Sequence, residues 1–388
     1  MDITIHPRKL CGSVAAIPSK SQAHRLLICA ALANNETTLV CPETNRDIEA
    51  TVDCLNALGA EIIRTKTGYF INPISKIPEN AVLSCCESGS TLRFLLPIVG
   101  ALGVDAVFQL EGRLPQRPLS PLWEEMARMG CCLSRPTKNT IRCTGKLQAG
   151  NYVIDGGISS QFITGLLFAL SLINGKCSLE ITGKVESRPY IDMTKSAMEL
   201  FDAPNYHTPG HIKVEGDWSN GAFWLAAKAL GNVLEIKNLN PESPQGDRAA
   251  RDLIPALEEN VIIDAADIPD LVPVLAMVAA ANHGAVFTSI QRLRIKESDR
   301  VATVIEMIVN LGGKAEATAD TLTVHGTGLR GGTVNSHNDH RIAMSAAIAA
   351  TVCTEPVTIL GAEAVKKSYP SFWEEYHRLG GHYEQYLR

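Results

Sequence analysis

The sequence lacks the features that would place the protein in a membrane or on nucleic acid. No stretch approaches the roughly 18 consecutive apolar residues that a membrane-spanning helix needs, and the N-terminal MDITIHPRKL has no apolar core typical of a secretion signal. A basic stripe is also missing, because 36 Lys and Arg face 41 Asp and Glu and the net charge is −5. We therefore expect a cytoplasmic protein that binds neither membranes nor nucleic acid.

Motifs for metals and dinucleotides are absent or incomplete. None of the eleven cysteines forms a C-x-x-C motif, and in a long chain without a leader we expect them to be reduced and mostly buried. HNDH at 337–340 could ligate a metal, but no further histidine or carboxylate cluster lies nearby in the sequence. GTGLRG at 326–331 is followed by a strand pattern rather than a helix, which argues against a dinucleotide site. We expect no metal and no organic cofactor.

What the sequence does contain is an internal repeat of about 70 residues. Four helical patterns end in a glycine and lead into a strand pattern, as expected where a left-handed residue ends a helix; two weaker copies lack the glycine. The equivalent points are Gly59, Gly130, Phe201, Glu258, Gly312 and Gly380, with spacings of 71, 71, 57, 54 and 68 residues. The pattern predicts six αβ units in two domains of three, with sheet material lost near residues 201–263.

Each unit also carries a more apolar helical pattern whose first residues are small or polar. These patterns lie at residues 19–32, 88–102, 159–172, 219–230, 267–280 and 338–350. They are apolar nearly all round, which indicates buried core helices, and they begin with residue types that cap helices. In a pseudo-symmetric domain such helices would run parallel, and their N-termini would form one face suited to anions.

The segment RLRIKESDR, residues 292–300, places six charges directly before an apolar run. Arg292, Arg294 and Lys296 alternate with apolar residues, which predicts a strand with three cations on one side. Glu297 and Arg300 follow at the start of the next element. Carboxylates inside a cationic site are an acid/base arrangement, and we favour this interpretation over a solvated surface face.

Nine motifs, in this order, resemble those of the EPSP synthase (3-phosphoshikimate 1-carboxyvinyltransferase) family. They are PSKSQAHR, ESGSTLRF, QRPLSPL, SSQFITGLL, SRPYIDMT, EGDWSNGAFW, DIPDLVPVLA, RLRIKESDR and NDHRIAMS. The resemblance implies an α/β fold of two pseudo-threefold domains, each with three βαβαββ-type repeats, in an inside-out α/β barrel known as the enolpyruvyl transferase fold. It implies one domain from residues 1–18 plus 217–388, an inserted domain at 19–216, and two crossover hinges near 17–19 and 214–217.

The resemblance also implies a reaction: the enolpyruvyl group of phosphoenolpyruvate is transferred to the 5-hydroxyl of shikimate 3-phosphate, and phosphate is released. The residues implied to bind shikimate 3-phosphate are Lys20, Ser21, Arg25, Ser159, Ser160, Gln161, Ser187, Tyr190, Asp270 and Lys296. Those implied to bind phosphoenolpyruvate are Lys20, Gly89, Arg117, Gln161, Arg300, Arg341 and Lys367. The groups implied to act in catalysis are Asp270, Glu297, Lys20 and Lys296, with Asp270 taking the hydroxyl proton and Glu297 protonating the methylene carbon. No metal or cofactor is implied, and we expect a monomer.

Two positions depart from the family pattern, and two alternatives stay open. Glu87 and Arg292 stand where the family often has Asn. The first alternative is the UDP-N-acetylglucosamine 1-carboxyvinyltransferase, which shares the fold but uses a loop cysteine; the comparable EGRLPQRPLSPL has none. The second is a non-catalytic anion-binding homologue. Arguing against it are four intact residues: Lys20, Asp270, Glu297 and Arg341.

Overall fold

The computed structural model describes residues 1–386, and the chain divides into two compact units. We call Pro18–Val214 the inserted unit. The terminal unit consists of Met1–Ile17 and the chain from Glu215 onward. The chain therefore passes between the units twice, after Ile17 and after Val214. No helix within residues 1–386 combines the length and the hydropathy that crossing a bilayer requires.

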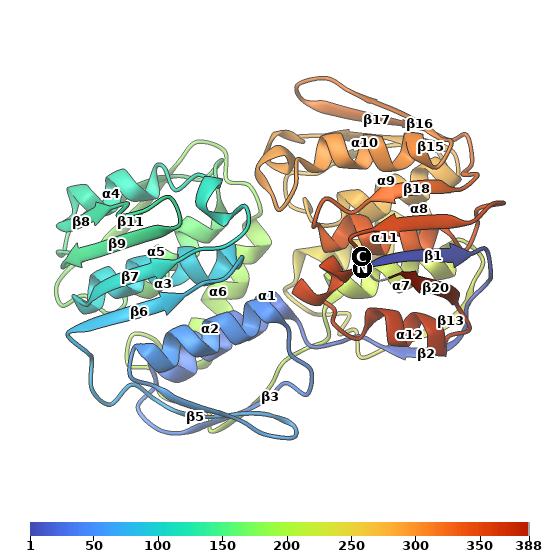
Figure 1. The fold of residues 1–388 in the computed structure, drawn as a ribbon. Helices are drawn as coiled ribbons and strands as arrows, with labels where there is room; N and C mark the ends of the chain where they lie inside the picture. The colour runs from blue at the N-terminus through green and yellow to red at the C-terminus, as the bar shows by residue number, and fades with distance from the viewer. Residues whose placement is uncertain (387–388) are drawn as a thin grey trace. The chain divides into compact units, whose positions relative to one another are not determined.

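The inserted unit is built from three sheets with helices packed against them (Figure 1). Its helices are α1 (Lys20–Ala31), α2 (Arg46–Ala57), α3 (Gly89–Leu102), η1 (Leu114–Gln116), α4 (Leu122–Arg128), α5 (Ser160–Leu170) and α6 (Arg188–Leu200). Its strands are β3 (Thr37–Val40), β4 (Glu61–Arg64), β5 (Gly68–Asn72), β6 (Asn80–Ser84), β7 (Asp105–Gln109), β8 (Cys131–Ser134), β9 (Thr140–Gly145), β10 (Asn151–Asp155), β11 (Ser178–Thr182) and β12 (His211–Lys213). The strand orders are β12-β3-β5-β4, β6-β7-β9-β8 and β10-β11.

The terminal unit repeats this plan. Its helices are α7 (Trp218–Ala229), η2 (Gly246–Ala249), α8 (Ala250–Ala256), α9 (Val272–Ala281), η3 (Gln291–Ile295), α10 (Arg300–Asn310), α11 (His340–Ala349), η4 (Ala362–Lys367) and α12 (Phe372–Arg378). Its strands are β1 (Asp2–His6), β2 (Cys11–Ala15), β13 (Val233–Lys237), β14 (Val261–Asp264), β15 (Gly284–Thr288), β16 (Lys314–Ala317), β17 (Thr321–His325), β18 (Gly332–Asn335), β19 (Val357–Leu360) and β20 (His382–Tyr386). The strand orders are β13-β2, β14-β15-β17-β16 and β18-β19-β1-β20.

The predicted repeat is confirmed in the order and direction of the strands. In the run from β6 to β9, the strands β6 and β7 pair in parallel, and the hairpin of β8 and β9 adds to β7 in antiparallel fashion. The run from β14 to β17 has the same order. Strand β1 from the N-terminus fills the corresponding place between β19 and β20, so the two chain ends complete one sheet. The two-stranded sheets β10-β11 and β13-β2 belong to the repeats whose helices end near Phe201 and Glu258, the points after which the spacing shortens to 57 and 54 residues.

Glycine ends four of the repeat helices, as predicted. Gly59, Gly130, Gly312 and Gly380 have φ angles of 101°, 110°, 84° and 95°. Residues with a Cβ atom rarely adopt such angles, because the side chain then clashes with the backbone. Each glycine therefore lets the chain leave its helix and enter the next strand.

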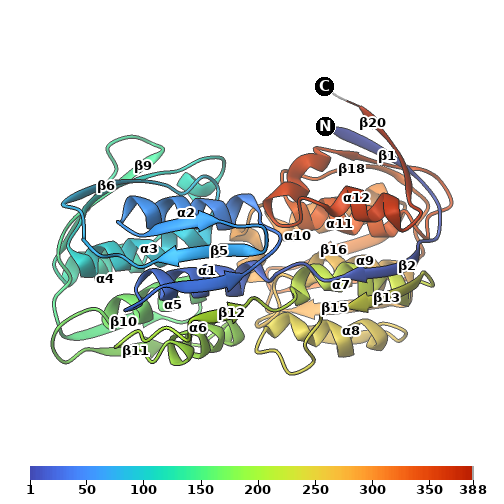
Figure 2. The same cartoon turned by 90° about the horizontal axis from the view of Figure 1, so that it is seen from below.

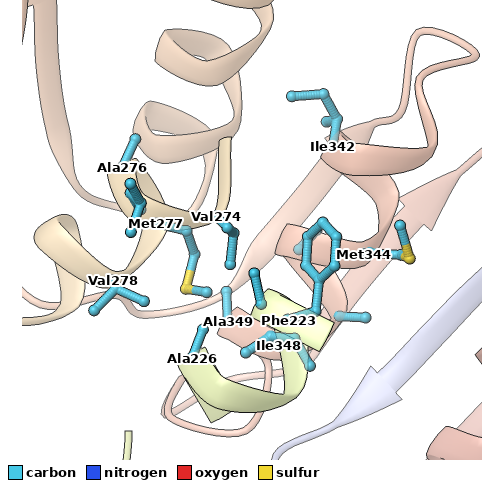
Figure 3. Close-up of a cluster of buried hydrophobic side chains, with 14 of the residues drawn as sticks. Phe223, Ala226, Val274, Ala276, Met277, Val278, Ile342, Met344, Ile348 and Ala349 are labelled. Carbon is cyan, nitrogen blue, oxygen red and sulfur yellow. The ribbon is translucent and has the colours of Figure 1, made fainter. Parts of the chain in front are cut away.

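The predicted core helices are α1, α3 and α5 in the inserted unit and α7, α9 and α11 in the terminal unit. In the terminal unit the three helices contact one another, and Figure 3 shows Phe223 of α7, Met277 of α9 and Ile348 of α11 in one cluster. All three side chains have 0% exposure. Figure 2 gives a second view of the same helices from below. Burial on this scale explains why their sequences are apolar on every side.

Five of the six core helices begin with the side-chain cap that their sequences predict. Ser19, Ser88, Ser159, Asp217 and Asp339 each accept a backbone N–H from the first turn of their helix. The exception is α9, whose preceding residue Leu271 gives no side-chain cap. The carboxylate of Asp270, one residue earlier, is used differently, as described below.

The predicted strand at residues 292–296 is wrong. Strand β15 ends at Thr288, and Ser289 has a left-handed φ of 58° that turns the chain out of the sheet. The following residues form the 3-10 helix η3, so the three cations do not share one side. Arg294 reaches Asp299 and the Thr318 carbonyl oxygen, whereas Lys296 reaches a different carboxylate.

Candidate active site

Asp270 is the centre of the charged cluster in the terminal unit. Its Oδ1 accepts from Arg300 Nη1 at 2.6 Å and lies 3.4 Å from Lys296 Nζ, while its Oδ2 lies 3.2 Å from Arg341 Nη2. Burial opposes ionisation of this carboxyl, but the three cations outweigh burial and hold its pKa well below the usual range. Asp270 is therefore ionised at neutral pH.

Arg300 connects three carboxylates through one guanidinium group. Besides Asp270, it donates to Glu297 Oε2 at 2.8 Å and through Nε to Asp339 Oδ2 at 2.9 Å. Arg300 is only 1% exposed and Asp339 is fully buried. Although burial disfavours the charged form of Asp339, Arg300 keeps its pKa below the usual range. The guanidinium thus fixes the separation of Asp270 and Glu297, the two carboxylates implied to move protons.

Lys296 and Glu297 stand side by side in the chain but experience different surroundings. Burial lowers the pKa of Lys296 to about 8, with Asp270 acting in the opposite direction. The Glu297 side chain is 26% exposed and paired with Arg300. An ammonium group whose pKa lies close to neutral pH and a partly accessible carboxylate are both suited to proton transfer.

Arg341 and Lys367 bring two further cations to the start of α11. Arg341 Nη1 donates to the Asp270 backbone oxygen at 2.9 Å. Lys367, the last residue of η4, donates to the Asn338 backbone oxygen at 2.8 Å. Both cationic side chains are largely buried. Together with Arg300 they form a set of fixed positive charges at the end of a core helix, which is a suitable place for an anion.

Asp247 is a further acidic group at this cluster, and the sequence analysis missed it. It lies in η2, is 2% exposed and accepts a hydrogen bond from Ser219 Oγ. Burial, reinforced by the nearby charge of Asp270, raises its pKa to about 6, while Arg341 acts against this rise. An isolated Asp in a loop sequence carries no signal that tertiary folding will bury it beside another carboxylate.

In the inserted unit, Lys20 opens α1 and pairs with Asp47 in the first turn of α2, at 2.9 Å. Both side chains are 16% exposed. The sequence analysis identified Lys20 but not Asp47. A carboxylate in the first turn of a helix is typical of plain helix stabilisation, so its partner could be found only from the fold.

Arg25 is buried among polar groups of α1, α5 and α6. It donates to the Ser21 carbonyl at 2.6 Å, to the Tyr190 carbonyl at 2.8 Å and to Thr194 Oγ1 at 2.8 Å. Burial lowers its pKa to about 10, which still leaves it charged at neutral pH. Ser187 precedes α6 with a left-handed φ of 55° and accepts from the Tyr190 N–H. Four of the predicted residues are thus brought together here.

The start of α3 brings together a second group of predicted residues. A Cβ atom at Gly89 would lie 2.7 Å from Arg117 Nη1 and 2.8 Å from Arg93 Nη1, so a larger residue would displace these guanidinium groups from their positions against the backbone. Arg93 also donates to Gln161 Oε1 at 2.8 Å, and Gln161 Nε2 donates to Ser90 Oγ at 3.0 Å. These contacts link the starts of α3 and α5.

Ser159 and Ser160 directly precede Gln161 at the start of α5. Ser159 caps the helix by accepting the Gln161 N–H at 3.3 Å, and Ser160 is its first residue. Several predicted site residues therefore lie at the starts of core helices: Lys20 and Ser21 of α1, Gly89 of α3, Ser160 and Gln161 of α5, and Arg341 of α11. Asp270, Lys296, Glu297, Arg300, Arg341 and Lys367 belong to the terminal unit, and the remaining predicted residues belong to the inserted unit.

Comparison with known proteins identifies the family. The model of EPSP synthase (3-phosphoshikimate 1-carboxyvinyltransferase) matches residues 5–262 and 255–376. The 3-phosphoshikimate 1-carboxyvinyltransferase of Clostridium kluyveri is 38% identical over 419 residues, covering 99% of this chain and 98% of the relative. The enzyme of the same name from Clostridium perfringens strain SM101 is 39% identical over 418 residues, covering 98% of each chain.

Solved structures share the fold at lower sequence identity. The EPSP synthase of Acinetobacter baumannii is 22% identical with a TM-score of 0.78, covering 99% of this chain and 100% of that one. The enolpyruvyl transferase NikO of Streptomyces tendae is 16% identical with a TM-score of 0.72, and the match covers 99% of this chain and 98% of NikO. These similarities confirm the predicted two-domain enolpyruvyl transferase fold.

The alignments also show that this chain has fewer residues than the relatives that it matches. An alignment of 419 positions exceeds the 388 residues of the chain by 31, so at least 31 positions are gaps on its side. The two segments matched by the family model overlap at residues 255–262, between α8 and β14. This junction follows the two-stranded sheet of β2 and β13, where a hairpin found in the four-stranded sheets is missing among the described residues. With matches over nearly its whole length, the chain belongs to the EPSP synthase (3-phosphoshikimate 1-carboxyvinyltransferase) family.

Proposed function

We propose that the protein transfers the enolpyruvyl group of phosphoenolpyruvate to the 5-hydroxyl of shikimate 3-phosphate and releases phosphate. The observation that carries this proposal is the arrangement of Asp270 and Glu297 on either side of the Arg300 guanidinium, among Lys296 and Arg341. Addition of the hydroxyl to the enol phosphate of phosphoenolpyruvate requires removal of one proton and delivery of another. Two carboxylates in different surroundings are suited to these tasks.

We propose that each unit supplies its own cations for the anionic substrates. In the terminal unit, Arg300, Arg341 and Lys367 would bind the phosphate and carboxylate of phosphoenolpyruvate. In the inserted unit, Lys20, Gly89, Arg117 and Gln161 would bind the same substrate. The remaining group of the inserted unit would bind shikimate 3-phosphate: Ser21, Arg25, Ser159, Ser160, Ser187 and Tyr190, with Lys20 and Gln161. Fixed cations and helix N-termini would stabilise the tetrahedral intermediate, which keeps a phosphate and a carboxylate on one carbon.

The low pKa of Asp270 has a consequence for its role as a base. A carboxylate held by three cations attracts a proton weakly. An anionic substrate that pairs with Arg300 and Arg341 would share their charge and make Asp270 more basic. Asp270 would then accept the 5-hydroxyl proton, with Lys296 holding the oxygen, and Glu297 would deliver a proton to the methylene carbon. Substrate binding would itself prepare the base.

The pKa of Lys296 predicts the alkaline limb of the pH profile. Below about pH 8 the ammonium form can attract shikimate 3-phosphate, and above it that charge is lost. We expect kcat/KM for shikimate 3-phosphate to fall by up to about tenfold per pH unit above this value. Lys296→Arg stays charged and should move the limb to higher pH, whatever its effect on the maximum. An identical limb in both proteins would assign the ionisation to another group.

Phosphate release tests the proposed reaction directly. Purified protein should release phosphate from phosphoenolpyruvate only when shikimate 3-phosphate is present, and the product should be 5-enolpyruvylshikimate 3-phosphate by mass spectrometry. UDP-N-acetylglucosamine in its place should give no release. Release with the sugar nucleotide, or with neither acceptor, would contradict the proposal.

We also propose that the enzyme is a cytoplasmic monomer that binds no nucleic acid. Two observations support a reducing location and the lack of a polyanionic partner. All eleven cysteines are free thiols, and the net charge is −5.

A further inference from the structure

A buried chain of hydrogen bonds ties the start of α3 to α1 and α2. His24 Nδ1 in α1 lies 2.7 Å from Thr51 Oγ1 in α2, and Thr51 Oγ1 lies 2.7 Å from Thr91 Oγ1 in α3. Thr91 Oγ1 donates to Ser88 Oγ at 2.7 Å. All four side chains have 0% exposure. Four polar groups so deeply buried are retained only when their hydrogen bonds are made.

The protons in this chain can be assigned by counting, because each hydroxyl has one proton to donate. Thr91 donates to Ser88 at 2.7 Å, and its other acceptor is the Asp47 carbonyl oxygen at 3.4 Å. In both cases its proton points away from Thr51, so the contact between the two threonines requires Thr51 as donor. Thr51 then has no proton left for His24. His24 must therefore donate through Nδ1.

The surroundings of His24 agree with this assignment. Burial, together with the charges of Lys20 and Arg25, holds its pKa well below the usual range, so the ring is neutral and has a single N–H. Its Nε2 is buried and has no hydrogen-bond partner among residues 1–386, and the ring meets Phe94 in a T-shaped contact at 6.3 Å. A buried N–H without an acceptor is rarer than an acceptor without a donor. The proton therefore belongs on Nδ1.

Ser88 and Thr91, two members of the chain, lie beside residues of the proposed phosphoenolpyruvate site. Ser88 caps α3 through the Thr91 N–H at 3.2 Å and immediately precedes Gly89, against which Arg93 and Arg117 pack. Thr91 also lies within 3.4 Å of the backbone oxygen of Asp47, whose carboxylate pairs with Lys20. The chain thus connects α1 and α2 to the first turn of α3.

We propose that His24 is a positioning residue: as the Nδ1–H tautomer it directs the chain of Thr51, Thr91 and Ser88 that holds the first turn of α3 in place to bind a phosphate or carboxylate group. The identification of that anion as phosphoenolpyruvate rests on the proposed function. The hydrogen-bond direction and the anion site at Gly89 do not. The two parts can therefore be tested separately.

The tautomer can be read by NMR with protein whose histidines are ¹⁵N-labelled in the ring. The His24 signals, assigned by their loss in His24→Asn, should show a protonated Nδ1 and an unprotonated Nε2. They should not titrate over the pH range in which the protein stays folded. A proton on Nε2, or an imidazolium near neutral pH, would overturn the assignment.

The positioning role can be tested with two isosteric variants of buried threonines in the inserted unit. Thr51→Val breaks the chain, whereas Thr37→Val removes a hydroxyl of equal burial that bonds to Thr208 at 2.7 Å in another part of the unit. We expect Thr51→Val to lower the affinity for inorganic phosphate about tenfold, as measured by titration of the Gly89 amide resonance. The same variant should raise KM for phosphoenolpyruvate about tenfold. Thr37→Val should change neither, and kcat should change less than twofold in both variants.

Variants of His24 itself give a second comparison. His24→Asn keeps an N–H donor near the Nδ1 position and should retain most of the phosphate affinity, whereas His24→Leu should resemble Thr51→Val. Equal phosphate affinities of Thr51→Val and Thr37→Val would overturn the positioning role. If the wild-type protein binds phosphate at Gly89 but does not turn over phosphoenolpyruvate with shikimate 3-phosphate, the proposed reaction fails while the tautomer and phosphate titration still decide this inference.

Discussion

Replacing Asp270 with Asn, or Glu297 with Gln, is expected to lower kcat by about 10²- to 10⁴-fold while shikimate 3-phosphate still binds. Each change keeps the size of the side chain and removes its ability to accept or deliver a proton. The expected loss is large because Arg300 fixes both carboxylates at 2.6 and 2.8 Å. The third carboxylate paired with Arg300 among residues 1–386, Asp339, is fully buried and cannot replace either of them.

The comparison needs a control for the chemical change alone. Asp252→Asn alters a carboxylate of the same unit that is 70% exposed and pairs with Arg251 at 3.0 Å. Its kcat should match that of the wild type. Steady-state kinetics would be combined with calorimetry of shikimate 3-phosphate binding. Near-normal turnover of both Asp270→Asn and Glu297→Gln would refute the acid/base assignment.

The architecture was predictable because its signals are local and repeated. Apolar helices with Ser or Asp at their starts predict core helices with capped N-termini, and five of six have that cap. Glycine after a helix predicts a left-handed residue, and Gly59 and Gly312 have it. The shortened repeats were visible from spacing alone. Each of these features depends on residues close together in the sequence, so tertiary context had little opportunity to override it.

The strand predicted at residues 292–296 failed for the opposite reason. Alternation over five residues is a weak signal, and a single left-handed residue, Ser289, redirects the chain before it begins. Two charged residues of this segment, Lys296 and Arg300, do meet a carboxylate, but not in the predicted geometry. Lys296, directly after η3, and Arg300, the first residue of α10, meet Asp270 rather than lying along one face of a strand.

Partners that come from distant parts of the chain could not be found from the sequence. Asp47 and Asp247 are ordinary acidic residues in their local sequences, and His24 is one histidine within an apolar helix. Their significance arises when folding places Asp47 beside Lys20, Asp247 beside Ser219, and His24 beside Thr51. Which polar groups become buried together is a property of the packed helices.

Arg300→Met is expected to lower the free energy of unfolding at neutral pH by about 3–5 kcal/mol, because breaking a buried ion pair leaves an uncompensated buried charge. Asp339 is the group most affected, since it is fully buried and loses its closest cation. Its pKa in the folded protein is lowered, so the stabilisation by Arg300 is present above the carboxyl pKa of the unfolded chain, about 4, and is lost as the pH falls through and below it. The difference between wild type and variant should therefore shrink at acidic pH.

Urea denaturation at neutral pH and near pH 3, below the unfolded carboxyl pKa of about 4, measures both effects, and Arg294→Met provides the matched control. Arg294 lies in the same charged segment but is 38% exposed and 3.7 Å from Asp299, so its loss should cost less than about 1 kcal/mol at either pH. A similar cost for the two arginines at neutral pH would show that the buried cluster does not depend on Arg300. A large cost for Arg300→Met that stays constant on acidification would instead attribute the loss to packing of the side-chain stem, because only the electrostatic part disappears when the carboxylates are protonated.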